Sequence, residues 1–241
     1  MRLPASLCAA FLALVLGLPA VAQDVERIKS DLRKKFPEAQ IESVRKSGYG
    51  GLLEVTGAGE LFYTDEKTTF LLLGTLVDTK TRENVTEARM RKISAIKFDS
   101  LPLEAAIKIV RGNGSRRIAI FADPNCGYCK RFEKELVNVP DITVYTFLYP
   151  ILSADSSEKS KAIWCAPDRG KAWLDYMIKD AMPAGAAPAN CETPIDRIVA
   201  FGREKRISGT PTIFFEDGER VPGAIPMATF EKRLADAKSA K

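Results

Sequence analysis

The chain has 241 residues, a formal net charge of +5 at pH 7 and no histidine. Because histidine is absent, the sequence excludes Ser-His-Asp and Cys-His hydrolases and every metal site that needs an imidazole ligand. Lysine and arginine are scattered among acidic residues without a concentrated basic stripe, so we expect no nucleic-acid partner.

Residues 1–22 are predicted to be a secretory signal peptide. Arg2 is followed by an apolar run from about Leu7 to Leu18 and then by the small residues Ala20-Val21-Ala22. A basic start, a short apolar segment and a small-residue cleavage site are typical of exported proteins. The run is short for a membrane span, although an uncleaved anchor is the alternative. We therefore expect a soluble mature chain that begins near Gln23.

Residues 23–85 are predicted to form a small domain with one helix and an antiparallel sheet. Apolar residues recur at helical spacing over residues 24–36, at Val25, Ile28, Leu32 and Phe36. Short strand-like segments separated by glycines follow. These strands are rich in apolar residues for so small a unit. These apolar residues could form the core of the small domain. The alternative is that they form a dimer surface or the wall of an apolar cleft.

Residues 86–112 are predicted to form a helical linker. Thr86 can cap its start, and Met90, Ile93 and Ile96 form an apolar stripe. The helix is interrupted before Leu103 and is expected to resume in the segment LEAAIKIV. Such a linker would be stiffer than a Gly/Ser tether.

Residues 113–241 follow the element order of a thioredoxin domain. The apolar run in RRIAIFAD is typical of a strand buried on both faces, and a helix is predicted directly after it. A second buried strand, a helical insertion over about residues 153–206, two strands and a last helix complete the order. The sequence therefore predicts an α+β chain whose C-terminal domain is of the α/β type.

The segment CGYC begins at the predicted junction of strand and helix. At a helix N-terminus, unpaired backbone N–H groups and the helix dipole stabilise a thiolate. We therefore expect the pKa of Cys126 to lie below the free value of about 8.5, so that Cys126 can attack disulfides. The shielded Cys129 would then be the thiol that resolves the mixed disulfide. Gly127 would allow a substrate to approach closely. Because Tyr128 is neutral, the pair is expected to be moderately oxidising.

Three other interpretations of CGYC remain open. It could form a structural disulfide, a four-cysteine zinc site with Cys165 and Cys191, or a copper site of two thiolates. The long spacings and the lack of a second CxxC argue against zinc, and we expect neither a metal nor a cofactor. Cys165 and Cys191 are expected to pair with each other, which would stabilise the fold by roughly 3 kcal/mol. A second redox pair is the alternative.

The segment SGTPT contains Thr210-Pro211, the apparent counterpart of the proline that faces the CxxC in thioredoxin-like domains. The resemblance to thioredoxin-like domains, in which this proline is cis, implies a cis peptide bond here, and such a bond is rarely accidental in a folded protein. The proline has no N–H that could engage the sulfur, and the backbone of Thr210 could pair with an extended substrate. An ordinary trans proline at a turn is the alternative.

Together, CGYC, KAIWCA, a distant second cysteine, SGTPT and VPG resemble the DsbC/DsbG family of periplasmic disulfide isomerases. The resemblance covers essentially the whole mature chain, and Gly127 with the Cys165/Cys191 pair favours the DsbC side. It implies a periplasmic homodimer joined through small cystatin-like N-terminal domains, with two thioredoxin-like domains facing a cleft. Cys126 would be the nucleophile and Cys129 the resolving thiol, and Gly127, Tyr128, Thr210 and Pro211 would contact the substrate.

The same resemblance implies the partners and the activity. The clients would be misfolded exported proteins with incorrect disulfides, the reductant would be an inner-membrane protein of the DsbD type, and chaperone activity is expected. A DsbG-like reductase of single oxidised cysteines and a holdase with incidental cysteines are the alternatives. Pro124-Asn125 departs from the β-branched pair of the best-studied members, which affects the expected potential and substrate preference but not the reaction type.

Overall fold

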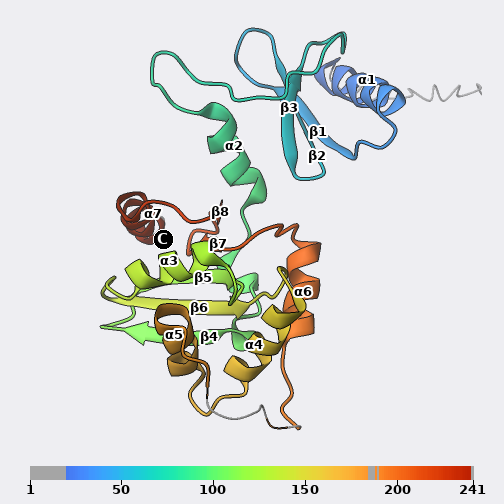
Figure 1. Ribbon diagram of the computed structural model, residues 1–241. Coiled ribbons are helices and arrows are strands. Elements are labelled where there is room, and N and C mark those ends of the chain that lie inside the picture. The colour runs from blue at the N-terminus through green and yellow to red at the C-terminus, as the bar shows by residue number, and fades with distance from the viewer. Residues whose placement is uncertain (1–19, 184–187, 189, 240–241) are drawn as a thin grey trace, which may run out of the picture. The chain divides into compact units, whose positions relative to one another are not determined.

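The computed structural model describes residues 20–183, 188 and 190–239 and divides into two compact units, with the boundary between Leu76 and Val77 (Figure 1). Residues 1–19 of the predicted signal peptide lie outside the described residues. Within the described part of the chain, no helix has the length and apolar character needed to cross a membrane. The mixed helix and sheet content confirms the predicted fold class.

The N-terminal unit packs one helix against a three-stranded antiparallel sheet whose order is β1-β2-β3. Ile28 and Leu32 of the helix are buried against Ile41, Val44 and Val55 of the sheet. The sequence predicts Phe36 on the same helical face, but Phe36 follows the last helical residue and is 41% exposed. The elements are α1 (Ala20–Lys35), β1 (Ile41–Lys46), β2 (Leu53–Gly57) and β3 (Glu60–Thr64).

The predicted linker is helical only in its first part. Helix α2 (Val85–Ser94) is capped by Asn84, whose side chain accepts from the Glu87 N–H at 2.8 Å. Two 3₁₀ turns follow, η1 (Phe98–Ser100) and η2 (Leu103–Ala105).

The predicted helix over LEAAIKIV is wrong, because the segment continues into the edge strand β4 (Ile107–Arg111). Strand β4 pairs antiparallel with its neighbour β6 (Ile142–Leu148), and the exposure of its side chains alternates as a half-buried strand requires. Its β-branched residues Ile107, Ile109 and Val110 fit a pleated edge better than a helix.

The C-terminal unit is built on a five-stranded sheet with the order β4-β6-β5-β7-β8. Strands β5 and β6 are parallel, and the other neighbouring pairs are antiparallel. The remaining strands are β5 (Arg116–Ala122), β6 (Ile142–Leu148), β7 (Thr212–Phe215) and β8 (Arg220–Pro222). The helices are α3 (Gly127–Leu136), α4 (Ala154–Trp164), α5 (Arg169–Lys179), α6 (Ile195–Glu204) and α7 (Met227–Ser239).

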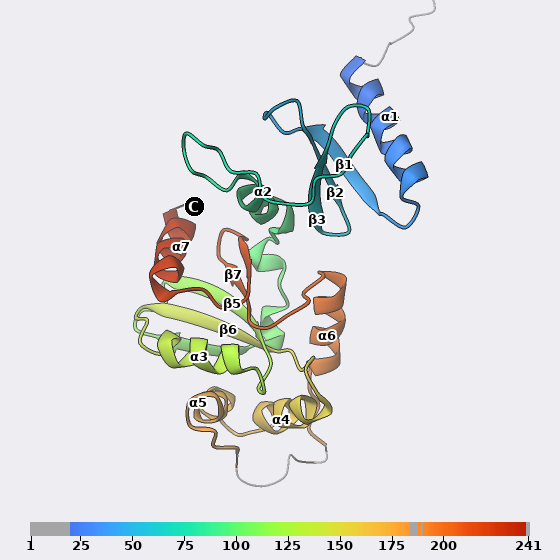
Figure 2. The same cartoon turned by 45° about the horizontal axis from the view of Figure 1, so that its top comes forward.

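Helices cover both faces of this sheet. Side chains of α3, α5 and α7, including Phe132, Trp173 and Phe230, form one core with the sheet. On the other face, Ile198 of α6 packs with Phe98 and with strand residues. Figure 2 shows α6 apart from α3 and α5. Strands β5 and β6 are parallel, and β7 starts opposite the end of β5. Three segments therefore meet at one edge of the sheet: the segment after β5, the segment after β6 and the segment before β7.

Candidate active site

Cys126 lies at that edge as the N-cap residue of α3. Strand β5 ends at Ala122, and a short turn follows in which the Cys126 N–H donates to the Asp123 carbonyl at 3.0 Å. The Cys126 Sγ in turn accepts from the Cys129 N–H at 3.3 Å, which is the geometry of a side-chain cap. The first cysteine of CGYC therefore receives hydrogen bonds from the start of the helix, as its position in the sequence predicts.

The Thr210-Pro211 peptide bond is cis and lies beside Cys126. Thr212 pairs with Phe121 of β5, which fixes the preceding loop against the CGYC turn. When Cys126 is protonated, its thiol donates to the Thr210 carbonyl at 3.2 Å. The Gly223 N–H of the VPG segment donates to the Pro211 carbonyl at 2.7 Å and holds the loop from its other side. The structure thus brings together two motifs that are distant in the sequence.

The two thiols of CGYC are chemically different. The pKa of Cys126 is lowered to about 5, first because the Cys129 side chain hydrogen-bonds to its sulfur and also because the Cys129 and Tyr128 N–H groups do so, although burial opposes the effect. Burial raises the pKa of Cys129 far above its ordinary value, and the adjacent Cys126 raises it further. Cys126 is therefore the thiolate of the pair at neutral pH, and Cys129 is a protonated thiol.

The two thiols of CGYC are nearly covered, but some of their neighbours are not. Cys126 is 5% exposed and Cys129 is 3% exposed, whereas Tyr128 is 62% exposed. Gly127 and Gly209 have free space where a Cβ atom would stand.

Asp123 is a buried carboxylate that the sequence reasoning missed. It accepts from the backbone N–H groups of Asn125, Ile151 and Leu152 at 2.8 to 3.0 Å and from the Ser156 hydroxyl at 2.7 Å. These bonds fasten the loop after β6 to the turn before Cys126. An aspartate directly after a buried strand is the signal that could have revealed it, because this is where a parallel sheet places its polar side chains.

Glu133 is a second buried acid, on the inner face of α3. Its Oε2 accepts from Trp173 Nε1 at 3.2 Å, and its Oε1 has no hydrogen-bond partner among the described residues. Burial raises its pKa to about 6, although the Trp173 hydrogen bond and the charge of Arg111 act in the opposite direction. No motif in the sequence identifies it, since a glutamate in a charged helix is usually exposed.

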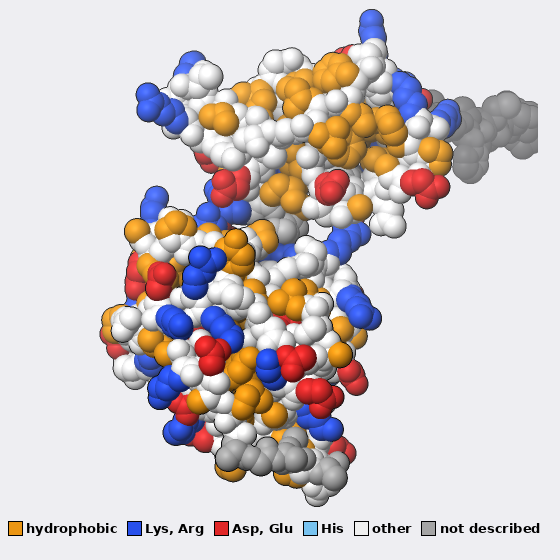
Figure 3. All heavy atoms as spheres, viewed as in Figure 1, with side chains coloured by type: hydrophobic (Ala, Val, Ile, Leu, Met, Phe, Trp, Pro, Cys, Tyr) orange, Lys and Arg blue, Asp and Glu red, His pale blue; other side chains and the backbone are white. Residues whose placement is uncertain are grey.

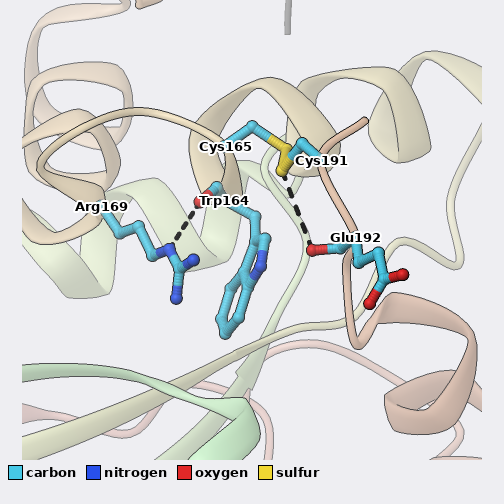
Figure 4. Close-up of a disulfide and its surroundings, with 5 residues drawn as sticks. All are labelled: Trp164, Cys165, Arg169, Cys191 and Glu192. Atoms are coloured by element: carbon cyan, nitrogen blue, oxygen red, sulfur yellow. Dashed lines mark hydrogen bonds between the residues drawn. A yellow bond between two sulfur atoms is a disulfide. The ribbon is translucent and has the colours of Figure 1, made fainter. Parts of the chain in front are cut away.

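Cys165 and Cys191 form a disulfide with their Cα atoms 6.1 Å apart (Figure 4). It joins the end of α4 to the segment that precedes α6. Trp164, next to it, is 6% exposed, and the Arg169 guanidinium lies 3.9 Å from its ring centroid. A zinc site made of all four cysteines would need these two sulfurs, which are bonded to each other. Cys126 and Cys129 are free thiols.

Comparisons with known proteins identify the family of each unit. Residues 103–238 match the family model of a thioredoxin-like domain, and residues 19–87 match that of the disulfide bond isomerase protein N-terminal domain. The probable thiol:disulfide interchange protein DsbC of Bordetella pertussis is 46% identical over 209 residues, which are 87% of this chain and 74% of that protein. The DsbC protein of Escherichia coli is 30% identical over 179 residues, or 71% of each chain.

A solved structure extends the comparison. The crystal structure of a disulfide interchange protein from Neisseria gonorrhoeae superposes with a TM-score of 0.55 and 39% sequence identity. The match covers 57% of this chain and 99% of the other.

Proposed function

The chain belongs to the DsbC family of thiol:disulfide interchange proteins, and from this premise we propose that it isomerises or reduces incorrect disulfides in exported proteins of the periplasm. The observation that carries the proposal is the Cys126 sulfur, which caps α3, has a lowered pKa and lies beside the cis-proline loop. A thiolate in such a position is the nucleophile that disulfide exchange requires.

The reaction begins when the Cys126 thiolate attacks one sulfur of a client disulfide. A mixed disulfide forms, the client S–S bond breaks, and the other client sulfur leaves as a thiolate. If a client thiolate then attacks the mixed disulfide, Cys126 is released and the client bond is reshuffled without net redox change. If Cys129 attacks instead, the client leaves fully reduced and Cys126 and Cys129 form a disulfide, which an external reductant must reduce.

The raised pKa of Cys129 suits the resolving step. The charge of the Cys126 thiolate is one of the causes that raise it. That charge disappears when Cys126 enters a mixed disulfide, so the Cys129 thiolate becomes easier to form at the stage at which it is needed. In the resting dithiol, Cys129 stays protonated and does not compete with Cys126.

Client recognition is proposed to combine backbone pairing with apolar contacts. Thr210 offers backbone groups to an extended chain next to Cys126. Tyr128 and Leu152 are 62% and 55% exposed, and Leu152 is held close to the CGYC turn by its hydrogen bond to Asp123. Exposed apolar side chains around the nucleophile favour misfolded clients, whose own apolar segments are accessible.

We also propose that the protein is a homodimer joined through its N-terminal units, that it has chaperone activity and that a reductant of the DsbD type keeps it reduced. Apolar side chains gather on the face of the N-terminal unit that Figure 3 shows. Phe70, Leu72 and Leu73 of this unit are 40% to 75% exposed, which is unusual for three apolar residues so close together.

The test is the refolding of a scrambled multi-disulfide protein by the reduced chain. The wild type is expected to restore native disulfides. The Cys126→Ser variant is expected to be inactive, and Cys129→Ser is expected to accumulate mixed disulfides with the client. If Cys126→Ser refolds the client as fast as the wild type, the protein is a holdase in which the cysteines are incidental.

A further inference from the structure

The side chain of Asn125 connects the CGYC turn to two helices of the helical insertion. Its Nδ2 donates to Asp155 Oδ2 at 2.7 Å, Ser156 Oγ at 3.1 Å and Ser153 Oγ at 3.3 Å, all at the start of α4. Its Oδ1 accepts from Lys159 Nζ of α4 at 2.8 Å and from the Tyr176 hydroxyl of α5 at 3.3 Å. Both ends of the amide are therefore occupied by hydrogen-bond partners.

The chemistry of these partners fixes which way the amide points. The Asp155 carboxylate can only accept a hydrogen bond when ionised, and the Lys159 ammonium can only donate. A side chain that hydrogen-bonds to both the carboxylate and the ammonium must carry a donor and an acceptor at the end of one short side chain, as asparagine does. Neither an aspartate nor an apolar residue of the same size can make both sets of bonds.

Asn125 directly precedes Cys126, and the acidity of Cys126 depends on local backbone geometry. The Cys126 Sγ accepts from the Cys129 N–H only while residue 126 keeps its extended N-cap conformation, with φ −75° and ψ 114°. The turn is held on one side by Asp123 and on the other by the side chain of Asn125. Asp123 also bonds the Ser156 hydroxyl, so the two residues share a partner in α4.

We propose that Asn125 is a positioning residue for Cys126, which ties the nucleophile to α4 and α5 and thereby couples the helical insertion to the reactivity of the redox pair. The inference rests on the proposed role of Cys126 as the nucleophile. Without the bonds of Asn125, the turn would sample conformations in which the sulfur leaves the N–H groups of α3. The thiolate would be less stabilised, and the reduced form would be less favoured over the disulfide.

The test compares the reduced full chain with its Asn125→Leu variant. Both side chains are neutral, so a change in the pKa of Cys126 cannot arise from an added or lost charge. Asp155 and Lys159 pair with each other at 2.7 Å. We expect this pair to persist without the amide, which favours a folded variant. The readouts are the rate of Cys126 alkylation across a pH series, followed by mass spectrometry, and the dithiol–disulfide equilibrium in glutathione buffers.

We expect the apparent pKa of Cys126 to rise by about one unit in Asn125→Leu, which corresponds to about tenfold slower alkylation at a pH below both values. The glutathione equilibrium is expected to shift toward the Cys126–Cys129 disulfide. The matched control is Asp168→Ala, which removes the N-cap of α5 but none of the partners of Asn125. It is expected to lower the melting temperature and to leave the pKa of Cys126 unchanged.

Two outcomes would overturn the inference while leaving the proposed function intact. One is a folded Asn125→Leu variant with the pKa and the equilibrium of the wild type. The other is an equal shift in Asp168→Ala, which would mean that any loosening of the insertion has this effect. A wild-type Cys126 with the pKa of a free thiol would instead refute the proposed function. If Asn125→Leu does not fold, Tyr176→Phe is expected to give a smaller rise, and no rise would refute the inference.

Discussion

Cys126 and Cys129 differ because one is the capping residue of α3 and the other lies within its first turn. Both lie in the core of the C-terminal unit, but only the Cys126 sulfur accepts the hydrogen bond from the Cys129 N–H. The sequence spacing predicts this asymmetry, since a helix that starts after Cys126 places Cys129 in its first turn. The burial of Glu133 on the same helix could not be predicted, because it depends on Trp173 and Arg111 from other elements.

The lowered pKa of Cys126 predicts that the reduced protein gains stability as the pH rises. The folded-state pKa of about 5 lies below the ordinary thiol value of 9.0, so the unfolded chain binds more protons between these values. Relative to Cys126→Ser, the reduced wild type is expected to become more stable from about pH 5 to about pH 9, as measured by urea unfolding. A difference between the two proteins that does not change with pH would contradict the assignment of Cys126 as the thiolate.

The raised pKa of Glu133 predicts the opposite effect in a more acidic range, where the stability of the protein is expected to fall as the pH rises. The folded state binds more protons than the unfolded chain between pH 4.5 and about pH 6. Relative to Glu133→Gln, the wild type is expected to lose about 2 kcal/mol of stability as the pH rises through this range. Urea unfolding of the oxidised proteins at several pH values measures the loss without the contribution of the Cys126 thiol. Parallel stability curves would show that Glu133 titrates normally.

At the level of elements, the site is assembled by three segments at one edge of the sheet. The turn after β5 carries Cys126, the loop after β6 is fastened to Asp123, and the loop before β7 carries the cis proline. The order of strands and helices along the chain predicts this arrangement. The strand β4 was predicted as a helix because its apolar residues fit both periodicities, and only pairing with β6 decides between them.

Removal of the Cys165–Cys191 disulfide is expected to destabilise the C-terminal unit without changing the redox pair. The disulfide links residues 26 apart, so the loop-entropy relation gives a loss of about 3.5 kcal/mol in the Cys165→Ala/Cys191→Ala double variant. Urea unfolding under non-reducing conditions measures this loss, and alkylation of Cys126 provides the control. If the alkylation of Cys126 is also slower in the double variant, the disulfide contributes to the catalytic mechanism and not only to the fold.

At the level of the whole molecule, the two units are proposed to have different tasks, with exchange chemistry in the C-terminal unit and association in the N-terminal unit. The sequence predicts both units, and the family models match each of them separately. The structure divides the chain between residues 76 and 77, and α2 belongs with the C-terminal unit, where Arg91 pairs with Glu219 at 3.2 Å. The N-terminal family model extends to residue 87.

The proposed homodimer predicts that an acidic substitution in the exposed apolar segment separates the chains. Leu73 is 75% exposed, and Leu73→Asp is expected to halve the mass measured by sedimentation and to abolish isomerisation. Reduction of a small disulfide by Cys126 is expected to survive, because the redox pair lies within the other unit. Val110→Asp, at a 52% exposed apolar position on β4, is the control and is expected to leave the mass unchanged. A wild type that sediments as a single chain would refute the dimer.

The sequence by itself determined the chemistry and the order of the elements. A CxxC at the junction of a buried strand and a helix needs only local periodicity and the physics of helix ends to be recognised. Tertiary structure alone decided which side chains surround that pair. Trp173 is 40 positions away from Glu133, and Tyr176 is 51 positions away from Asn125. Contacts at such separations depend on how helices and strands pack, and no local pattern in the chain records them.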